Sequence, residues 1–170
     1  FSCTKKSPND PLFSLLTRNQ RITGEWKLVS YNHTYIFTYS SGDTSSEEIN
    51  FDGDIKTTLV SSSWGGTTET RQLYSKYIQF KKDGTWVINE TMEDVTTGQI
   101  SNKQTNGDWV WTNSNNKKTG LNLYGYDAGF WPIEKLSNQK LITSYSSNRT
   151  ITDSIITTNN FIENAQWEKQ

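Results

Sequence analysis

Several residue types that build enzymes, disulfide scaffolds and helical proteins are scarce in this chain. Its 170 residues include one cysteine, one histidine and one methionine, and alanine occurs only twice. A lone cysteine excludes an intrachain disulfide, and little Ala and Met disfavours a helical protein. A zinc site needs about three or four His, Cys or acidic ligands, so this supply argues against one. No apolar run of about 18 residues occurs either, so we expect no membrane-spanning helix.

The balance of charges excludes a further class of protein. Lys and Arg number 17 and Asp and Glu number 18, whereas phosphate binding needs a basic surplus, so a dedicated nucleic-acid binder is not expected. Apolar residues make up only 32%, but aromatics reach 13%, enough for a core of a few large side chains. Asn, Ser and Thr together number 58. This composition is typical of an extracytoplasmic β protein, and the length indicates one domain with a tail.

Cys3 stands at the start of a polar stretch. It follows Phe1-Ser2 and precedes Thr4 to Asp10, a segment with two lysines and a proline that is typical of a flexible linker. This position resembles the lipidated cysteine of a bacterial lipoprotein, with Phe1-Ser2 as the end of a signal peptide. The alternative is an incidental N-terminal cysteine. We therefore predict a lipoprotein N-terminus and linker over 1–9 and a lipid-anchored place in the cell envelope, at the outer membrane or facing the periplasm.

A short helix is expected before the strands begin. Asp10-Pro11 combines an N-cap residue with proline at the first helical position. Leu12, Leu15 and Leu16 then form one apolar face. We expect this helix to end near Arg18-Asn19 and to plug or flank a core.

The chain from Gly24 onward is typical of antiparallel β structure. A change of apolar parity near Ser30 to His33 predicts a bulge or a strand that changes faces. Asp83-Gly84 lies between two alternating segments and predicts a hairpin. A three-residue turn over Lys82 to Gly84, with Gly84 left-handed, pairs apolar with apolar: Phe80 with Trp86, and Ile78 with Ile88.

Turn signals recur along the rest of the chain. Ser40 to Ser46 is predicted to be a loop. Glu48 to Ser63 is predicted to hold one or two strands, with Asp52-Gly53 as a candidate turn. Thr96 to Lys103 is polar and predicts an edge strand, while Pro132 restricts its segment to an edge or a strand start. The spacing predicts eight to ten short strands in a barrel or sandwich over 10–170.

Motifs in a fixed order resemble a known family. Gly24-Glu-Trp26 after a short helix resembles the start of a lipocalin, whose first strand opens with Gly-x-Trp. Phe80 to Trp86, a second Gly-x-Trp at Gly107 to Trp109, and the Ile133 to Leu141 hairpin are similar to lipocalin-like lipoproteins of Bacteroidetes. The resemblance implies an antiparallel lipocalin-like β-barrel with the tryptophan packed across its closed end. It also implies a late arginine over that ring; here the late cations are Arg149 and Lys169, neither in a recognisable motif. It implies no particular activity.

Catalytic and metal-binding patterns are weak. His33 lies in an aromatic strand without a nearby Gly-x-Ser-x-Gly motif, so we predict no enzyme. Asn50 to Asp54 resembles the opening of a calcium loop, but Ile55 and Ser61 stand where that loop needs glycine and glutamate, which indicates turn carboxylates. Glu90 shares its strand parity with apolar residues, and we interpret it as a strand-end residue. We expect no metal and no cofactor.

The seven tryptophans and eight tyrosines are the main clue to function. In one interpretation, inward side chains fill the closed end of a barrel and line a cup or leave no cavity: Trp26, Leu28, Phe80, Trp86, Trp109 and Trp111. In another, a carbohydrate-binding module stacks sugars on exposed rings: Trp64, Tyr124, Tyr126 and Trp131.

The sequence favours a lipid-anchored, lipocalin-like protein that binds a small, mostly apolar ligand or none. The alternatives are a protein-interaction barrel, such as a protease inhibitor or an envelope assembly subunit, and a carbohydrate-binding module. We expect contact with a membrane through the lipid anchor alone, no nucleic acid, and a monomer or weak oligomer.

Overall fold

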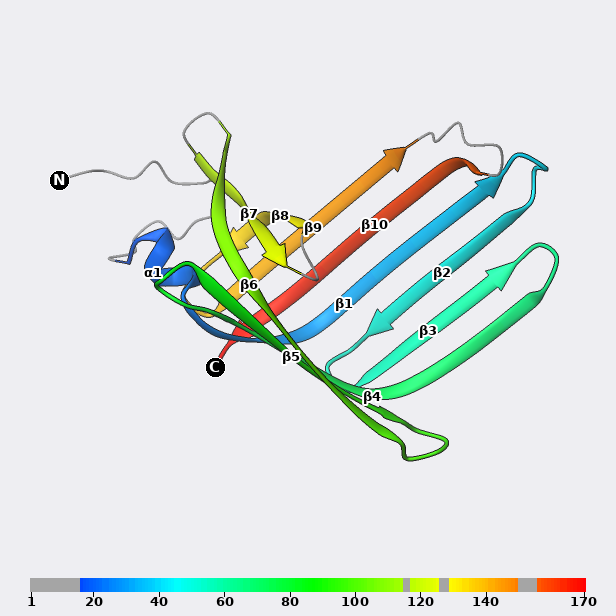
Figure 1. Ribbon diagram of the computed structural model, residues 1–170, viewed down its shortest axis with the longest axis horizontal. Coiled ribbons are helices and arrows are strands. Elements are labelled where there is room, and N and C mark those ends of the chain that lie inside the picture. The colour runs from blue at the N-terminus through cyan, green and yellow to red at the C-terminus, as the bar shows by residue number, and fades with distance from the viewer. Residues whose placement is uncertain (1–15, 115–116, 126–128, 150–155) are drawn as a thin grey trace.

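The computed structural model describes residues 16–114, 117–125, 129–149 and 156–170. Cys3, the expected helix start at Asp10-Pro11 and Tyr126 lie outside these residues. The described chain is almost entirely β structure (Figure 1). It has one helix, α1 (Arg18–Ile22), and ten strands: β1 (Gly24–Tyr39), β2 (Thr44–Phe51), β3 (Ile55–Ser62), β4 (Gly66–Phe80), β5 (Thr85–Asp94), β6 (Ile100–Ser114), β7 (Lys117–Gly125), β8 (Gly129–Leu136), β9 (Lys140–Arg149) and β10 (Ile156–Lys169).

The strands form a closed antiparallel barrel, which confirms the predicted fold class. Each strand pairs with its neighbour in the chain, and β1 closes the ring by pairing with β10. The first residues of β1, Gly24 to Lys27, also pair directly with Tyr77 to Phe80 of β4. The β2–β3 hairpin is bypassed there, so two of the ten strands drop out and eight close the ring at this end. An eight-stranded barrel has an interior that side chains alone can fill.

The wall of the barrel is uneven at the other end. Strands β7 and β8 are short, and β7 pairs with β6 only over Gly107 to Ser114. The outer part of β6, Ile100 to Asn106, therefore has β5 as its one described partner. Likewise, β9 beyond Thr143 pairs with β10 but not with β8. Figure 1 shows the two sides diverging, with β5–β6 running away from β9, β10, β1, β2 and β3. The barrel is thus narrow at one end and open at the other.

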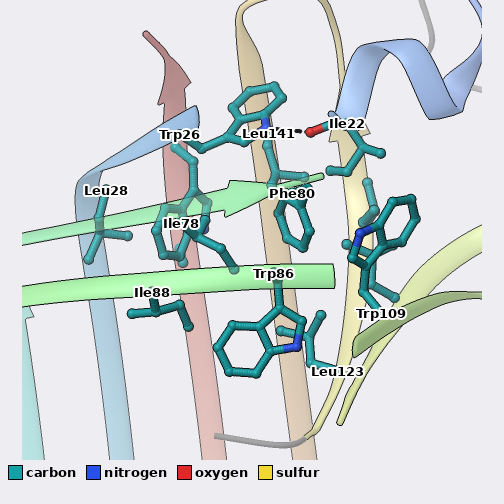
Figure 2. Close-up of a cluster of buried hydrophobic side chains, with 14 of the residues drawn as sticks. Ile22, Trp26, Leu28, Ile78, Phe80, Trp86, Ile88, Trp109, Leu123 and Leu141 are labelled. Carbon is teal, nitrogen blue, oxygen red and sulfur yellow. Dashed lines mark hydrogen bonds between the residues drawn. The ribbon is translucent and has the colours of Figure 1, made fainter. Parts of the chain in front are cut away.

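The narrow end is filled by large apolar side chains (Figure 2). Helix α1 covers it: Ile22 is fully buried, and its carbonyl oxygen accepts a 2.7 Å hydrogen bond from the indole Nε1 of Trp26. A capping box between Thr17 and Gln20 starts the helix. The side chains buried with them include Leu28, Ile78, Phe80, Trp86, Ile88, Trp109, Leu121, Leu123, Leu136 and Leu141.

A lysine takes the position over the Trp26 ring. The Lys169 ammonium lies 5.3 Å from the ring centroid and donates a 3.0 Å hydrogen bond to the carbonyl oxygen of Arg21. This contact links the last strand, the first strand and α1, and a cation over an indole face is an attractive arrangement. The side chain of Arg149, the other late cation, is not among those described.

Local predictions about turns hold well. Phe80 pairs with Trp86 and Ile78 with Ile88, as expected, and Gly84 is left-handed with φ of 90°. The register of β1 against β10 shifts between Leu28 and Ser30, just before the range Ser30 to His33 in which a bulge or a change of faces was expected. The Asp52-Gly53 turn also separates two strands, β2 and β3.

Other boundaries were wrong. The described helix, Arg18–Ile22, begins where we expected a helix to end, because the Thr17 capping box starts it there, and most of the helix expected from Asp10 lies outside the described residues. The expected loop at Ser40 to Ser46 is shorter, since β2 begins at Thr44. Of the polar edge strand expected at Thr96 to Lys103, only the part from Ile100 is strand; it begins β6, whose outer half does lie on an edge.

Candidate functional site

A cavity of about 280 Å³ lies directly above the packed end of the barrel. Its floor is apolar and consists of Leu28, Trp131, Ala165 and Trp167. The two indole rings are stacked, with centroids 5.5 Å apart and planes 28° from parallel. The walls above this floor are polar, and they carry lysine, glutamate and tyrosine side chains from β1, β3, β4, β5 and β10. We call this cavity the cup.

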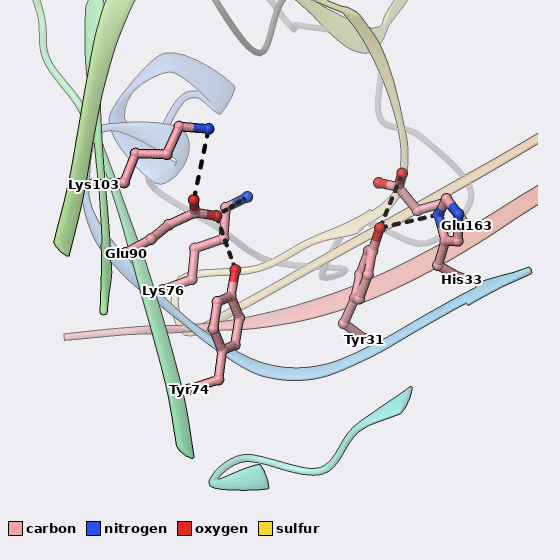
Figure 3. A network of polar contacts seen from close by, with 7 residues as sticks. All are labelled: Tyr31, His33, Tyr74, Lys76, Glu90, Lys103 and Glu163. Carbon is pink, nitrogen blue, oxygen red and sulfur yellow. Dashed lines mark hydrogen bonds and ion pairs between the residues drawn. The ribbon is translucent and has the colours of Figure 1, made fainter. Parts of the chain in front are cut away.

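One wall of the cup is organised by Glu90, in the middle of β5. The Tyr74 hydroxyl donates a 2.8 Å hydrogen bond to Glu90 Oε1, and Lys76 Nζ lies 2.8 Å from the same oxygen. Lys103 Nζ lies 3.9 Å from Oε2 (Figure 3). Burial opposes ionisation, but Lys76, Tyr74 and Lys103 outweigh it and hold the pKa of Glu90 below its usual value. Because β5 continues to Asp94, Glu90 lies within the strand, and the prediction that it is a strand-end residue was wrong.

Lys56 adds a further cation to this wall. Its Nζ lies 5.2 Å from the ring centroid of Tyr74, a cation–π contact. Burial, together with the charge of Lys76, lowers the pKa of Lys56, while Glu90 and Glu47 act in the opposite sense. Within the described part of the chain, its ammonium group makes no ion pair within 4 Å.

The opposite wall is organised by Glu163 of β10. The Tyr31 hydroxyl donates a 3.5 Å hydrogen bond to Glu163 Oε2 and also lies 3.2 Å from Nδ1 of His33. Figure 3 shows these three residues across an open space from the Glu90 group. Burial raises the pKa of Glu163, although Lys76 and the Tyr31 hydrogen bond oppose the shift. Burial and the nearby Glu163 charge raise the pKa of Tyr31 as well.

Aromatic side chains continue from the Glu163 wall toward the open end. Phe161 is in edge contact with His33 at 4.9 Å, with Tyr145 at 5.5 Å and with Tyr35 at 5.8 Å between ring centroids. Tyr35 in turn contacts Phe37 at 4.1 Å. These rings come from β1, β9 and β10, on the tall side of the barrel. Aromatic side chains therefore line the barrel between the cup and its open end.

The six side chains predicted to line the barrel interior lie in three places. Trp26, Phe80, Trp86 and Trp109 are buried in the packed end, below the cup. Leu28 lies on the cup floor. Trp111 packs against the core from its edge, where its Nε1 donates a 2.6 Å hydrogen bond to Asn19 Oδ1. One of the six thus borders the cavity.

Sequence reasoning missed the polar half of the site. The missed polar side chains come from strands that are mostly far apart in sequence, so they come together only when the barrel closes: Tyr31, Lys56, Tyr74, Lys76 and Glu163. Trp167 of the apolar floor was missed as well. The Lys76–Glu90 pair could have been predicted from the sequence. Extending the predicted hairpin register by two residues beyond Ile78 and Ile88 places Lys76 opposite Glu90.

The rings chosen for sugar stacking do not form one platform. Trp64 is exposed at the β3–β4 turn, where it contacts Tyr39 at 5.0 Å. Tyr124 is exposed on β7, opposite Asp108. Trp131 instead faces the interior, on the cup floor. An exposed sugar platform of the predicted composition is therefore not assembled among the described residues.

The described residues contain neither a metal-ligand cluster nor a membrane-spanning helix. Among the described residues, no group of three His, Cys, Asp or Glu side chains could hold a metal ion. The same part of the chain contains no helix with the length and apolar character needed to cross a membrane. Comparison of the chain with protein-family models, curated proteins and solved structures finds no match.

Proposed function

We propose that this protein is a binding protein that holds one small ligand in the cup. The observation that carries the proposal is the cavity of about 280 Å³ between a tryptophan floor and walls of paired lysine, glutamate and tyrosine. Ligand pockets are concave, largely apolar and equipped with a few convergent polar groups, and they range upward from about 300 Å³. The polar walls favour an amphipathic ligand over the mostly apolar one expected from the sequence.

The energetics of the cup support this proposal. Keeping Glu163 and Lys56 away from water costs free energy that a filled apolar barrel would not incur. Ionisable groups with perturbed pKa values in a cavity are common at binding sites, although structural ion pairs perturb pKa values too. Among the described residues, neither Glu163 nor Lys56 has an ion-pair partner within 4 Å, so each keeps a charge available to a ligand.

A cavity-filling substitution tests the proposal. Ala165 is buried on the cup floor, whereas its neighbour Asn164 is exposed on the outer face of β10. We expect Ala165→Met to fill the cup and abolish ligand binding while the protein stays folded, and Asn164→Met to bind normally. The readout is native mass spectrometry of the protein purified from its own host, followed by organic extraction of bound molecules. Equal ligand occupancy in both variants would contradict binding in the cup.

We also propose that the protein is a lipocalin-like lipoprotein of the cell envelope, anchored through Cys3. The resemblance of the Gly24–Trp26 motif, and a lysine over the Trp26 ring, are compatible with this placement. The test is the mass of the protein isolated from membranes. A diacylglyceryl mass increment lost in Cys3→Ser supports the anchor, and an unmodified Cys3 in membrane fractions contradicts it.

A second candidate is a protein-interaction barrel, favoured by the strand edges at the open end. The outer halves of β6 and β9 each lack a described partner on one side. An unpaired edge offers backbone groups to an extended peptide. Proline substitution at Ser146 would block pairing at the β9 edge without touching the cup. Loss of a captured partner in this variant, with ligand occupancy unchanged, would favour the second candidate.

A further inference from the structure

A second cavity of about 280 Å³ adjoins the cup along β8, β9 and β10. It is lined by Gly129, Phe130 and Trp131 of β8, Tyr145 of β9, and Phe161 and Glu163 of β10. Trp131 lies opposite the buried Leu121 and faces inward, whereas Phe130 lies opposite Asn122 and packs over Gly120 on the outer face. We call the three inward rings, of Trp131, Tyr145 and Phe161, together with the carboxyl group of Glu163, the Glu163 box. Trp131 and Glu163 also line the cup, so the two cavities share a boundary. No lysine or arginine is among the described residues that line the box.

The carboxyl group of Glu163 has little internal compensation. Its one hydrogen bond among the described residues comes from Tyr31, at the long distance of 3.5 Å. Lys76 acts on Glu163 from across the cup, but its ammonium group lies 2.8 Å from Glu90 and is already paired there. By contrast, Glu90 accepts a 2.8 Å hydrogen bond from Tyr74 in addition to that ion pair. Glu163 therefore lacks a cation of its own.

The rings of the box favour the same kind of ligand as the carboxylate. The face of an aromatic ring attracts a cation within about 6 Å of its centroid, more strongly when both are shielded from water. A partly buried carboxylate likewise gains most from a positive partner. An anion would be repelled by Glu163, and an uncharged sugar or alcohol would use the rings but leave the carboxylate unpaired. Organic ammonium ions satisfy both features together.

We propose that the Glu163 box binds the ammonium group of a small organic amine, with the rest of the ligand lying in the cup. The proposal rests on the proposed function and names the chemical class of its ligand. Trp131, Tyr145 and Phe161 border the alkyl groups on the nitrogen, and Glu163 supplies the countercharge. The polar groups of the Glu90 wall then remain available to the other end of the ligand.

A matched pair of probes tests the charge requirement. Choline carries a trimethylammonium group, and the alcohol with a tert-butyl group in its place has the same shape without the charge. Titration of the full chain, followed by tryptophan fluorescence and by calorimetry, should give saturable choline binding at least about tenfold tighter than binding of the alcohol. Equal affinity for the two probes, or no choline binding, would overturn the proposal.

Variants assign the effect to the box. Glu163→Gln should remove the preference for choline, whereas Glu168→Gln, on the exposed face of the same strand, should keep it. Phe161→Leu should weaken choline binding and leave the alcohol little affected, because it removes a ring but retains an apolar side chain. A choline preference that survives Glu163→Gln overturns the proposal.

The outcomes also separate this proposal from the binding function itself. Binding of the uncharged alcohol that is abolished by Ala165→Met, with no preference for choline, would keep the cup as a ligand site and reject the amine. Failure of both probes, together with an empty protein from the native host, would reject both.

Discussion

The two halves of β4 illustrate how differently the ends of this barrel are built. Near the closed end, Ile78 and Phe80 face the interior and are buried among aliphatic and aromatic side chains. At the next two inward positions, Tyr74 and Lys76 face the cup and surround Glu90. The closed end gains stability from burial and close packing. The cup keeps charged groups half-buried. Because these groups contribute little to stability, we attribute their presence to ligand binding.

The difference between the two ends predicts which substitutions change the free energy of unfolding most. Substitutions at the closed end should lower the free energy of unfolding strongly, whatever they do to binding. Substitutions in the cup should alter stability less, and in one case raise it, while they change binding.

The largest loss is expected for Trp86→Ala. Trp86 is fully buried, and its Nε1 donates a 2.9 Å hydrogen bond to the carbonyl oxygen of Asp108. Removing a buried tryptophan costs about 3–5 kcal/mol in the free energy of unfolding. Urea denaturation measures this change. The control is Trp64→Ala at an exposed turn, and a similar loss in both variants would show that Trp86 is not the core residue described here.

A smaller loss is expected for Gly107→Ala. A Cβ atom at Gly107 would collide with the carbonyl oxygen of Tyr124 and would come within 3.0 Å of the Trp86 ring. Relieving this overlap in a packed wall should cost about 2 kcal/mol. At Gly129, by contrast, an added Cβ meets nothing within 4 Å. Thermal unfolding should show a lower Tm for Gly107→Ala alone, and an unchanged Tm would contradict this packing.

Glu90→Gln should have an intermediate effect. The variant loses the ion pair with Lys76, and we expect a cost of about 1–2 kcal/mol at neutral pH. The folded pKa of Glu90 lies below its ordinary value of 4.5, so its contribution is present above that pH and is lost as pH falls through the folded pKa. The difference between wild type and Glu90→Gln should therefore shrink in acid. Glu93→Gln on the same strand is the control, and a pH-independent difference would argue against the ion pair.

The β5 wall also illustrates what the sequence could predict. Asp83-Gly84 and the alternation around it predict the hairpin correctly, because turn chemistry and apolar pairing are local. The same register continued to Lys76 places it opposite Glu90, so this half of the cup was within reach of sequence reasoning. Interpreting Glu90 by itself, rather than with its cross-strand partner, led to the wrong assignment.

The Glu163 wall was beyond such reasoning. Tyr31 and Glu163 are 132 residues apart, and they meet because β1 and β10 close the ring. The direct pairing of β1 with β4 below the β2–β3 hairpin is equally non-local. Alternation indicates which residues share a face of a strand, but it does not say which strands are neighbours. The packed end was easier to predict than the cup, because large aromatic residues are expected to face the interior whichever strands are neighbours.

Glu163→Gln should produce the smallest change in stability, and in the opposite direction. Burial raises the pKa of Glu163, so the unfolded chain ionises near its ordinary value of 4.5 and the folded chain at a higher pH. The carboxyl group therefore favours folding below pH 4.5, and that contribution is lost as pH rises through the folded pKa. An amide avoids the loss and can still accept the Tyr31 hydrogen bond.

We expect the free energy of unfolding of Glu163→Gln at neutral pH to be higher than that of wild type by about 1 kcal/mol, which corresponds to about 3 °C in Tm. The gain should disappear below pH 4.5. Denaturation of the ligand-free protein across this range measures it, with Glu168→Gln as the exposed control. A neutral-pH loss of stability would mean that the Glu163 carboxylate has a stabilising internal partner, and the contrast between the two walls of the cup would then be wrong. A gain, combined with loss of choline preference, would show that this carboxylate is retained for binding at the expense of stability.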